Sequence, residues 1–393
     1  MIEGAINGMD RQTDRQTDLI NKIRQVKFFS ITDDETHKII HLCGLKLKMK
    51  NSKKKLNKII NIAIKDAFNN VTEEYLHKHN QYYVSSTRAL HELFIKYLEK
   101  NDINKEYTDL ISNLDDKSIK LVSRALNVLE RCGKNSGFAT CYVSDEEKIQ
   151  REEVKQLKEH VVRLNDNAYM LDKYTLPVNE FHPEVFYSEY GLDECSNIDR
   201  TKCIIDAGAW IGDSSLVLAK YTDDKVYAFE PFKSSYDLLN KTAELNKLQD
   251  KIIPVNKGIS NVDDKITINI AARPNNCTLI NYDVVDNTTM TISQEKIDVT
   301  SIDNFVKEHN LSVGVIKSDI EGAEPLLLEG ARETISTQRP VLIISIYHTP
   351  EDFFKIKPML ESWNLDYTFK IRKLHPNCFI TDLVLICEPK NNN

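Results

Sequence analysis

The stretch CIIDAGAWIGDSSLVLAKYTDDKVYAFEP, residues 203–231, holds the residue types best suited to chemistry. Asp206 ends a short apolar run, Gly208 and Gly212 follow within one turn, and Glu230 ends a second apolar run. Glycines let a backbone turn sharply and approach a ligand without a Cβ in the way. A carboxylate at the second strand end can accept hydrogen bonds from two neighbouring ribose hydroxyls. The pattern therefore predicts half of a nucleotide-binding βαβ unit.

Two common phosphate-binding fingerprints do not fit this turn. A dinucleotide fingerprint that started at Gly208 would need glycines where Trp210 and Asp213 stand, and no Gly-Lys-Ser/Thr follows Gly212. What remains, D-x-G-x-x-x-G and then an acid after the next strand, resembles motif I of S-adenosylmethionine-dependent methyltransferases. A ligand with an ammonium and a sulfonium suits a carboxylate better than a phosphate cradle would. The alternative is an ordinary strand–turn–helix.

Two more polar residues are expected at the same edge of the sheet. A buried strand within 313–331 ends at Asp319, and the apolar run 341–348 ends at His348. Methyl transfer to oxygen needs an aligned acceptor and a group that takes its proton. Asp319 is the first catalytic candidate, and His348 is the second candidate for the base. Substrate orientation or help in binding a divalent ion stays open for Asp319, as does a capping role for His348.

The elements that must position these residues alternate between strand and helix from residue 176 onwards. Pro231 opens a helix, a strand follows over 252–255, and Ile259 and Ser260 then lie at the sheet edge, where they can meet an adenine. The tail 368–389 resembles an antiparallel closing hairpin. The predicted fold class is α/β, a Rossmann-like class I methyltransferase sheet, mostly parallel with an antiparallel closing strand, preceded by a mainly helical N-terminal domain.

Three regions are predicted: a flexible or basic segment over 1–58, a helical domain over 59–175 and a methyltransferase domain over 176–393. Apolar stripes predict helices over 87–100 and 118–132, and a third from about Asp145 to about Met170. The helical half can serve as a lid, an acceptor-specificity element or a homo-oligomer contact, and the sequence does not separate these roles.

The composition limits the cellular compartment and the binding partners that we expect for this chain. A formal net charge of -7 argues against general nucleic-acid binding, and no apolar run reaches the ~20 residues of a membrane span. The eight cysteines show no C-x-x-C pairing, so we expect a cytoplasmic protein with reduced thiols and no metal site. The basic stretch Lys46–Lys58 either contacts the inner face of a membrane or forms a solvated β-hairpin or tail.

Several motifs together resemble one family. DAGAWIGDS (206–214), AFEP (228–231), LN (245–246), KSDIEGAE (317–324) and LLEG (327–330) resemble the FkbM-type methyltransferases. The resemblance covers about 176–389, and Trp210 departs from the smaller residue that is more frequent there. It implies S-adenosylmethionine-dependent O-methylation of a sugar hydroxyl, expected here in surface-polysaccharide or glycan assembly. The cofactor-binding residues that we assign are Asp206 (to the ammonium), Gly208, Ala209, Gly212, Glu230 (to the ribose), Pro231, Ile259 and Ser260.

Two alternatives remain beside that function. The same fold can methylate another small hydroxylated metabolite, or it can be a non-catalytic cofactor-binding scaffold that relies on its helical half. The intact acids Asp206, Glu230 and Asp319 weigh against the scaffold.

Overall fold

The computed structural model describes residues 29–33, 37–42, 45–50, 81–85, 88–134, 138–271, 292–378 and 380–390. The chain forms two compact units, Met1–His79 and Asn80–Asn393. In the first unit, three strands pair antiparallel in the order β1-β2-β3: β1 (Phe29–Asp33), β2 (His37–Leu42) and β3 (Leu45–Lys50). The strands fit the β-hairpin alternative for the basic stretch. Residues 51–58 lie outside the described residues, so the membrane contact stays a prediction.

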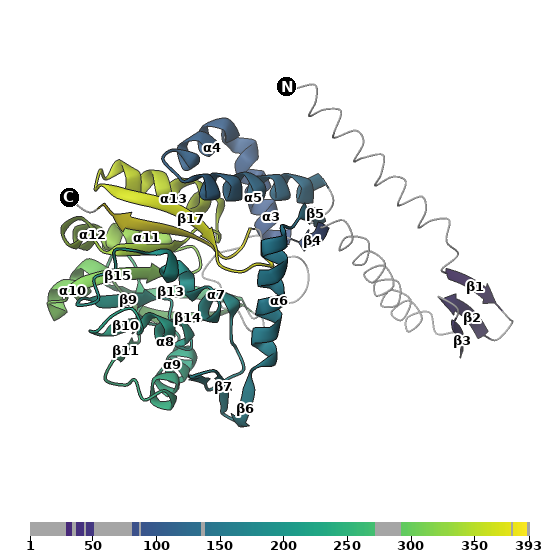
Figure 1. The fold of residues 1–393 in the computed structure, drawn as a ribbon, viewed down its shortest axis with the longest axis horizontal. Helices are drawn as coiled ribbons and strands as arrows, with labels where there is room; N and C mark the ends of the chain where they lie inside the picture. The colour runs from purple at the N-terminus through teal and green to yellow at the C-terminus, as the bar shows by residue number, and fades with distance from the viewer. Residues whose placement is uncertain are drawn as a thin grey trace. The chain divides into compact units, whose positions relative to one another are not determined.

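A seven-stranded sheet is the centre of the second unit (Figure 1). Its order is β11 (Ile252–Val255), β10 (Val226–Phe229), β9 (Cys203–Ala207), β15 (Val313–Ser318), β16 (Val341–Ser345), β18 (Leu383–Pro389) and β17 (Tyr367–Lys373). All neighbours pair parallel except β18, which is antiparallel to both of its neighbours. Apolar runs rich in Val and Ile suit strands that are buried on both faces. The predicted fold class is confirmed.

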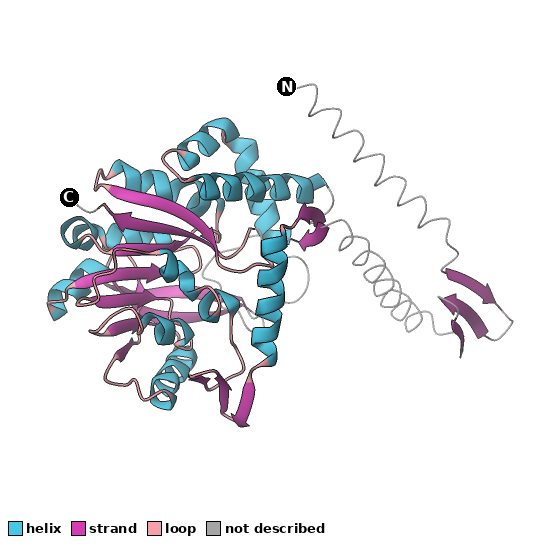
Figure 2. Cartoon of the chain, in the orientation of Figure 1, coloured by secondary structure: helices cyan, strands magenta, loops and turns pink. Residues whose placement is uncertain are grey.

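Helices cover both faces of this sheet (Figure 2). Strand β9 shows why, because Cys203 and Ile205 belong to one apolar cluster and Ile204 to another, as the two-residue period of a strand requires. One face packs on α10 (Ile302–His309), α11 (Glu324–Gly330), α12 (Arg332–Gln338) and α13 (Pro350–Ser362). The other packs on α7 (Pro183–Phe186), the 3₁₀ helix η1 (Glu189–Glu194), α8 (Asp213–Leu218) and α9 (Lys233–Leu245).

The region before the sheet contains the predicted helices and one more. The helices are α3 (Arg88–Lys100), α4 (Ile103–Ile111), α5 (Asp116–Lys134) and α6 (Asp145–Glu159). The predictions over 87–100 and 118–132 are confirmed, whereas α4 was not predicted. Phe94 of α3 packs on Phe353 and Phe354 of α13, with ring centroids 5.7 and 6.3 Å away. This part of the chain therefore shares a core with the sheet, and the boundary at residue 175 stays a prediction.

The helix predicted from Asp145 to Met170 is wrong beyond Glu159. Three short strands follow in antiparallel order: β6 (Val162–Asn165), β7 (Ala168–Leu171) and β8 (Tyr174–Leu176). The Val161-Val162 pair favours extended backbone, and a turn follows in which the Asn167 N–H donates to Asn165 Oδ1 at 2.8 Å. A two-stranded sheet of β4 (Gln81–Ser85) and β5 (Phe138–Tyr142) likewise replaces part of the predicted helical region.

A third small sheet has the order β12-β14-β13. Its strands are β12 (Gly258–Ile259), β13 (Asp264–Ala271) and β14 (Ile292–Thr300). Strand β12 pairs parallel to β14, which places Ile259 beside Thr300.

Candidate active site

The site lies where the strand order of the main sheet reverses. From β9 the chain moves to β10 on one side, whereas β15 lies on the other side. In open α/β sheets, ligands bind at the carboxyl ends of the strands at such a switch point. Gly208, with φ of 78°, follows β9 there, and a Cβ at this position would lie 2.0 Å from the Asp319 carbonyl oxygen. A glycine is therefore required for the two predicted halves of the site to meet.

Asp206 holds this turn from inside the protein. Its side chain has no exposed surface, and its Oδ2 accepts hydrogen bonds from Ser214 Oγ at 2.7 Å and Ser215 Oγ at 2.6 Å. Its Oδ1 lies 3.0 Å from Lys317 Nζ. Both oxygens thus have internal partners, which tie the end of β9 to the start of α8 and to β15. Direct contact between Asp206 and a cofactor ammonium stays a prediction.

Lys317 is a residue of the site to which the sequence reasoning gave no role. Its side chain is 1% exposed, its Nζ donates to the Gly208 carbonyl at 2.9 Å, and it lies 4.7 Å from the centre of the Tyr190 ring. Burial lowers the pKa of Lys317, but the charges of Asp206 and Asp319 outweigh it and raise that pKa above its ordinary value. A lysine within the apolar run of β15 was the signal, because a buried cation needs a carboxylate partner.

A second glycine and a group of charges line the start of α8. Gly212 has a φ of 86°, and its backbone begins the helix. Behind it, burial raises the pKa of the Asp213 carboxyl to about 6. His182 lies over Trp210 with ring centroids 5.3 Å apart, and its hydrogen bond with Glu184 raises the histidine pKa to about 9. Trp210 thus packs against His182, which is paired with Glu184, at the edge of the turn.

Glu230 is buried at the end of β10, and its predicted contact with a ribose stays a prediction. Its Oε1 accepts the Phe232 N–H at 2.9 Å, and burial raises the pKa of its carboxyl to about 8. Pro231 follows it and lies 3.7 Å from where a Cβ on Gly258 would be, so β12 packs close to this end of the strand. Ile259 and Ser260 are mostly buried. Their predicted contact with an adenine stays a prediction.

Asp319 is the partly exposed acid of the site. Its backbone N–H donates to the Ala207 carbonyl at 3.0 Å, which binds the ends of β9 and β15 together. Its carboxylate accepts hydrogen bonds from Tyr190 Oη at 3.0 Å and from Tyr347 Oη at 3.4 Å. Burial raises the Asp319 pKa, but the nearby His348 and Lys317 cations outweigh it and leave that pKa below its ordinary range.

His348 lies behind Asp319 and is 5% exposed at its side chain. Its Nε2 lies 3.3 Å from Asp319 Oδ1 and 3.7 Å from Glu321 Oε2, and its Nδ1 lies 3.4 Å from Glu324 Oε1. Burial alone would lower the pKa of His348, but the carboxylates of Glu324 and Asp319 raise it well above its ordinary value. Burial likewise raises the pKa of the Glu321 carboxyl to about 7.

The structure thus brings Asp206, Gly208, Asp319 and His348 to one edge of the sheet, as the sequence predicted. It adds Tyr190 and Tyr347, which the sequence reasoning did not single out for a role. Tyr190 comes from η1, shortly before β9. Its φ of 54° turns the chain sharply at Gly191 and the Tyr190 hydroxyl reaches Asp319.

Comparisons with known proteins find similarity to methyltransferases. The model of the methyltransferase FkbM domain matches residues 206–376. "Methyltransferase 1" of Beauveria bassiana is 24% identical over 209 residues, which cover 48% of this chain and 83% of that protein. "Methyltransferase sdnD" of Sordaria araneosa is 30% identical over 108 residues, which cover 26% of this chain and 42% of that protein.

Among solved structures, Methyltransferase FkbM from Methylobacillus flagellatus KT is similar, with 20% identity and a TM-score of 0.48. The alignment covers 75% of this chain and 60% of that chain. Within the part of the chain that is described, no helix is long and apolar enough to cross a membrane. Residues 206–376 are thus the part of the chain that is similar to the methyltransferase FkbM domain, the family that the sequence motifs resemble.

Proposed function

We propose that this methyltransferase domain uses S-adenosylmethionine to methylate a hydroxyl oxygen of a sugar during glycan or surface-polysaccharide assembly. One observation carries the proposal: the glycine turn after β9 lies against Asp319, since a Cβ on Gly208 would come within 2.0 Å of the Asp319 carbonyl. A nucleoside held at the turn therefore has its reactive end beside a partly exposed carboxylate. In-line methyl transfer needs that closeness.

The residues at the turn fit S-adenosylmethionine, although not all in the predicted way. Glu230 is a buried carboxylate at the place where a ribose diol is expected, and Gly208, Ala209 and Gly212 supply backbone without bulky side chains. Pro231, Ile259 and Ser260 form the proposed adenine side. Since the described partners of the Asp206 carboxylate are Ser214, Ser215 and Lys317, we assign Asp206 to holding the turn in shape.

On the acceptor side, S-adenosylmethionine supplies an electrophilic methyl group, and the chain must orient a hydroxyl and take its proton. Asp319 meets the acceptor because its side chain is 21% exposed, whereas His348 is 5% exposed behind it. Tyr190 and Tyr347 fix the Asp319 carboxylate by donating hydrogen bonds to it. His348 therefore acts through Asp319, and Asp319 is the group that touches the acceptor.

A hydroxyl-rich acceptor suits the polar character of this edge. Carboxylates of Asp319 and Glu321 can accept hydrogen bonds from hydroxyl groups, and the partly exposed Tyr347 ring offers an apolar surface on which a sugar ring can pack. The described cysteines Cys195, Cys203, Cys378 and Cys387 are unpaired, which supports a cytoplasmic location. A homo-oligomer through the helical half and a membrane contact through Lys46–Lys58 belong to the same proposal.

Calorimetric titration tests the cofactor. The purified chain should bind S-adenosylmethionine with micromolar affinity and should not bind NAD. Glu230→Ala should abolish the binding because the ribose loses its acceptor, whereas Glu244→Ala, an exposed change on α9, should leave it intact. If neither ligand binds, the enzyme proposal fails and the scaffold alternative replaces it.

A second assay tests the acceptor class. Methyl-labelled S-adenosylmethionine is incubated with a set of nucleotide sugars and alkyl glycosides and, separately, with a set of phenolic and aliphatic alcohols. Label should enter the sugar set, and Asp319→Asn should lose turnover while S-adenosylmethionine binding persists. Label in the other set alone would reject the sugar and favour another hydroxylated metabolite.

A further inference from the structure

A bulky residue occupies a left-handed backbone position inside the glycine turn. Trp210 lies between Gly208 and Gly212 and has a φ of 44°. This conformation is rare for a residue with a large side chain, whereas asparagine and glycine adopt it far more readily. Strained backbone of this kind persists only where the surrounding structure holds it in place. Contacts around Trp210 must therefore stabilise the turn.

The left-handed turn directs the Trp210 N–H towards the predicted ribose acid. The N–H groups of Gly208 and Ala209 both donate to the Phe229 carbonyl, at 3.1 and 3.0 Å, so the chain crosses the end of β10 here. The next N–H, that of Trp210, hydrogen-bonds to Glu230. Burial raises the pKa of the Glu230 carboxyl to about 8, and backbone N–H groups, that of Trp210 among them, oppose the rise. Trp210 thus contacts Glu230 through its backbone.

The ring of Trp210 packs on His182. The two ring centroids are 5.3 Å apart, and the ring planes are tilted by 36°. The His182 nitrogens Nδ1 and Nε2 each lie 3.1 Å from a carboxylate oxygen, of Glu184 and Glu180 respectively. The hydrogen bond with Glu184 raises the His182 pKa to about 9, so this ring is a cation at neutral pH. A cation within about 6 Å of an indole is attracted to it.

The backbone places His182 independently of its side chain. The His182 carbonyl accepts the N–H groups of Val185 and Phe186 at 3.1 and 2.9 Å, at the start of α7. Among the described residues, the His182 side chain makes no hydrogen bond that caps this helix. Phe181, one residue earlier, belongs to the same apolar cluster as Ile211 of the turn. Replacing the His182 side chain therefore removes the stacked ring and leaves the start of the helix intact.

We propose that His182 and Trp210 are positioning residues for Glu230. The stacked histidine stabilises Trp210 in its left-handed conformation, and the Trp210 N–H then orients the Glu230 carboxyl for a ribose diol. The binding of a ribose by this carboxyl rests on the proposed function. An asparagine at position 210 would adopt the same conformation without support, so the need for His182 should vanish in that variant.

Amide exchange in the cofactor-free chain tests the contact between the two rings. The chain has two tryptophans, so ¹⁵N-tryptophan labelling gives two backbone amide signals, and Trp210→Phe identifies that of Trp210. His182→Gln should speed the exchange of the Trp210 amide about tenfold, because the turn loses its support. The Trp363 amide, which donates to the Leu360 carbonyl at 3.2 Å, is the internal control and should not change. Unchanged exchange at Trp210 would overturn the proposal.

Calorimetric titration with S-adenosylmethionine tests the effect on Glu230. In the wild-type background, His182→Gln should weaken binding about tenfold, whereas in the Trp210→Asn background it should weaken binding less than about twofold. Trp210→Phe keeps an aromatic ring and should keep the dependence on His182. The matched control is His309→Gln, which removes an exposed histidine stacked on Phe305 at 4.2 Å and should leave binding within about twofold.

Equal weakening by His182→Gln in the wild-type and Trp210→Asn backgrounds would overturn the role of Trp210, because the histidine would then act without it. Circular dichroism checks that each variant folds, and the exchange result decides if Trp210→Asn does not. A wild-type chain that binds no S-adenosylmethionine contradicts the proposed function instead. The exchange experiment needs no cofactor and still decides whether His182 supports the turn at Trp210.

Discussion

At the scale of single residues, the burial of charge takes two forms in this site. Asp206 and Lys317 neutralise each other with almost no solvent contact. Glu230 is also buried, but its carboxylate accepts hydrogen bonds from backbone N–H groups, such as that of Phe232. A paired charge is stable over a wide pH range, whereas burial favours the neutral form of Glu230 because it outweighs the backbone hydrogen bonds that favour the carboxylate. The two acids should therefore respond differently to pH and to mutation.

We expect Glu230→Gln to stabilise the cofactor-free chain at high pH. The folded state raises the Glu230 pKa from 4.5 to about 8. The contribution of Glu230 to stability is therefore fully present below pH 4.5, and it is lost as pH rises through 8. Glutamine does not titrate, so the variant should gain on the wild type by a few kcal/mol, on the order of the shift, between pH 5 and pH 9. Thermal unfolding at pH 5, 7 and 9 measures the difference.

The matched control is Glu244→Gln, at an exposed position of α9. Its effect on stability should stay within about 0.5 kcal/mol at each pH, because surface substitutions away from special contacts change little. If the stability difference between Glu230→Gln and the wild type stayed constant from pH 5 to pH 9, the buried carboxylate would not titrate as described.

Lys317→Met should be among the most destabilising changes in the sheet. The substitution keeps an apolar stem but leaves Asp206 as a buried charge without its cation, a situation that costs about 3–5 kcal/mol. Urea unfolding measures the loss. The double variant Asp206→Asn with Lys317→Met should recover part of it, because no uncompensated charge remains. A double variant less stable than the single one would show that the ion pair is not the reason.

At the scale of elements, the sequence predicted what periodicity controls and missed what local turns control. The strands β9, β15 and β16 and the helices α3 and α5 follow from apolar runs and stripes. The end of α6 at Glu159 could not be predicted from this pattern. The apolar spacing of a helix continues through Val161 and Leu164, although the backbone there has already changed to strands. Tyr190 was missed for a related reason: its left-handed backbone and its reach to Asp319 depend on tertiary contacts.

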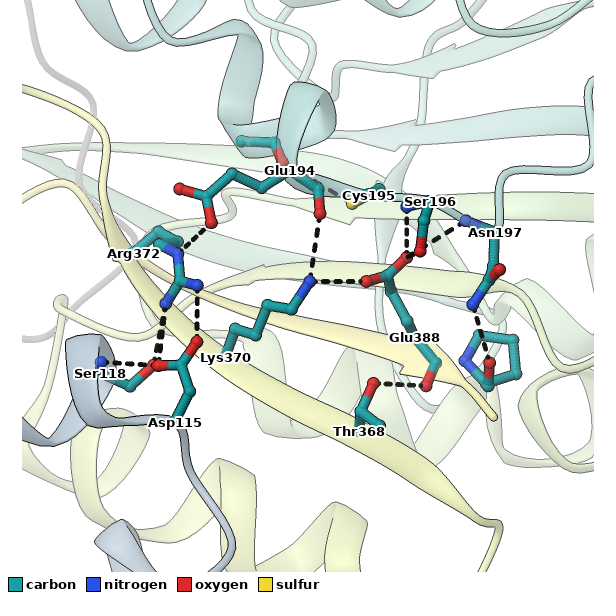
Figure 3. Close-up of polar contacts among 12 residues, drawn as sticks. Asp115, Ser118, Glu194, Cys195, Ser196, Asn197, Thr368, Lys370, Arg372 and Glu388 are labelled. Carbon is teal, nitrogen blue, oxygen red and sulfur yellow. Dashed lines mark hydrogen bonds and ion pairs between the residues drawn. The ribbon is translucent and has the colours of Figure 1, made fainter. Parts of the chain in front are cut away.

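Arg372 on β17 connects three elements (Figure 3). It donates to Asp115 Oδ2 at 2.7 Å, just before α5, to Ser118 Oγ at 3.0 Å on α5 and to Glu194 at the end of η1. Nearby, Lys370 on the same strand pairs with Glu388 on β18 at 2.9 Å. These contacts tie the segment that carries Tyr190 to the closing hairpin and to α5. The helical region and the site are thus linked through β17.

We expect Arg372→Leu to destabilise the chain by about 1–3 kcal/mol. The arginine side chain is 8% exposed, but Asp115 and Glu194 are 39% and 31% exposed, so water compensates part of the loss. Chemical unfolding measures it. The matched control Arg163→Leu removes an exposed pair with Asp166 and should cost less than about 1 kcal/mol. Equal costs would mean that the Arg372 contacts contribute no more than a surface pair.

At the scale of the whole molecule, the question is whether the helices before the sheet are a separate domain. Leu90, Phe94 and Val122 belong to the same apolar cluster as Ile316 of β15 and Phe353 of α13. Stripe analysis identified the inward faces of α3 and α5 but not the surface that covers them, because a stripe does not identify its partner. A shared core favours cooperative unfolding of residues 80–393, whereas independent domains would unfold in two steps.

Phe94→Ala decides between these two behaviours. Phe94 is fully buried against Phe353 and Phe354, so the cavity should cost about 3–5 kcal/mol. The chain's two tryptophans, Trp210 and Trp363, both lie in the sheet region, so their fluorescence follows the sheet while circular dichroism at the helix band weights the helices. In one cooperative unit, the variant moves both unfolding curves by the same amount. Ile149→Ala, at a side chain exposed on α6, should move neither. If Phe94→Ala shifted the helical signal alone, the helices would be a separate domain and their effect on the methyltransferase site would have to pass through the Arg372 contacts.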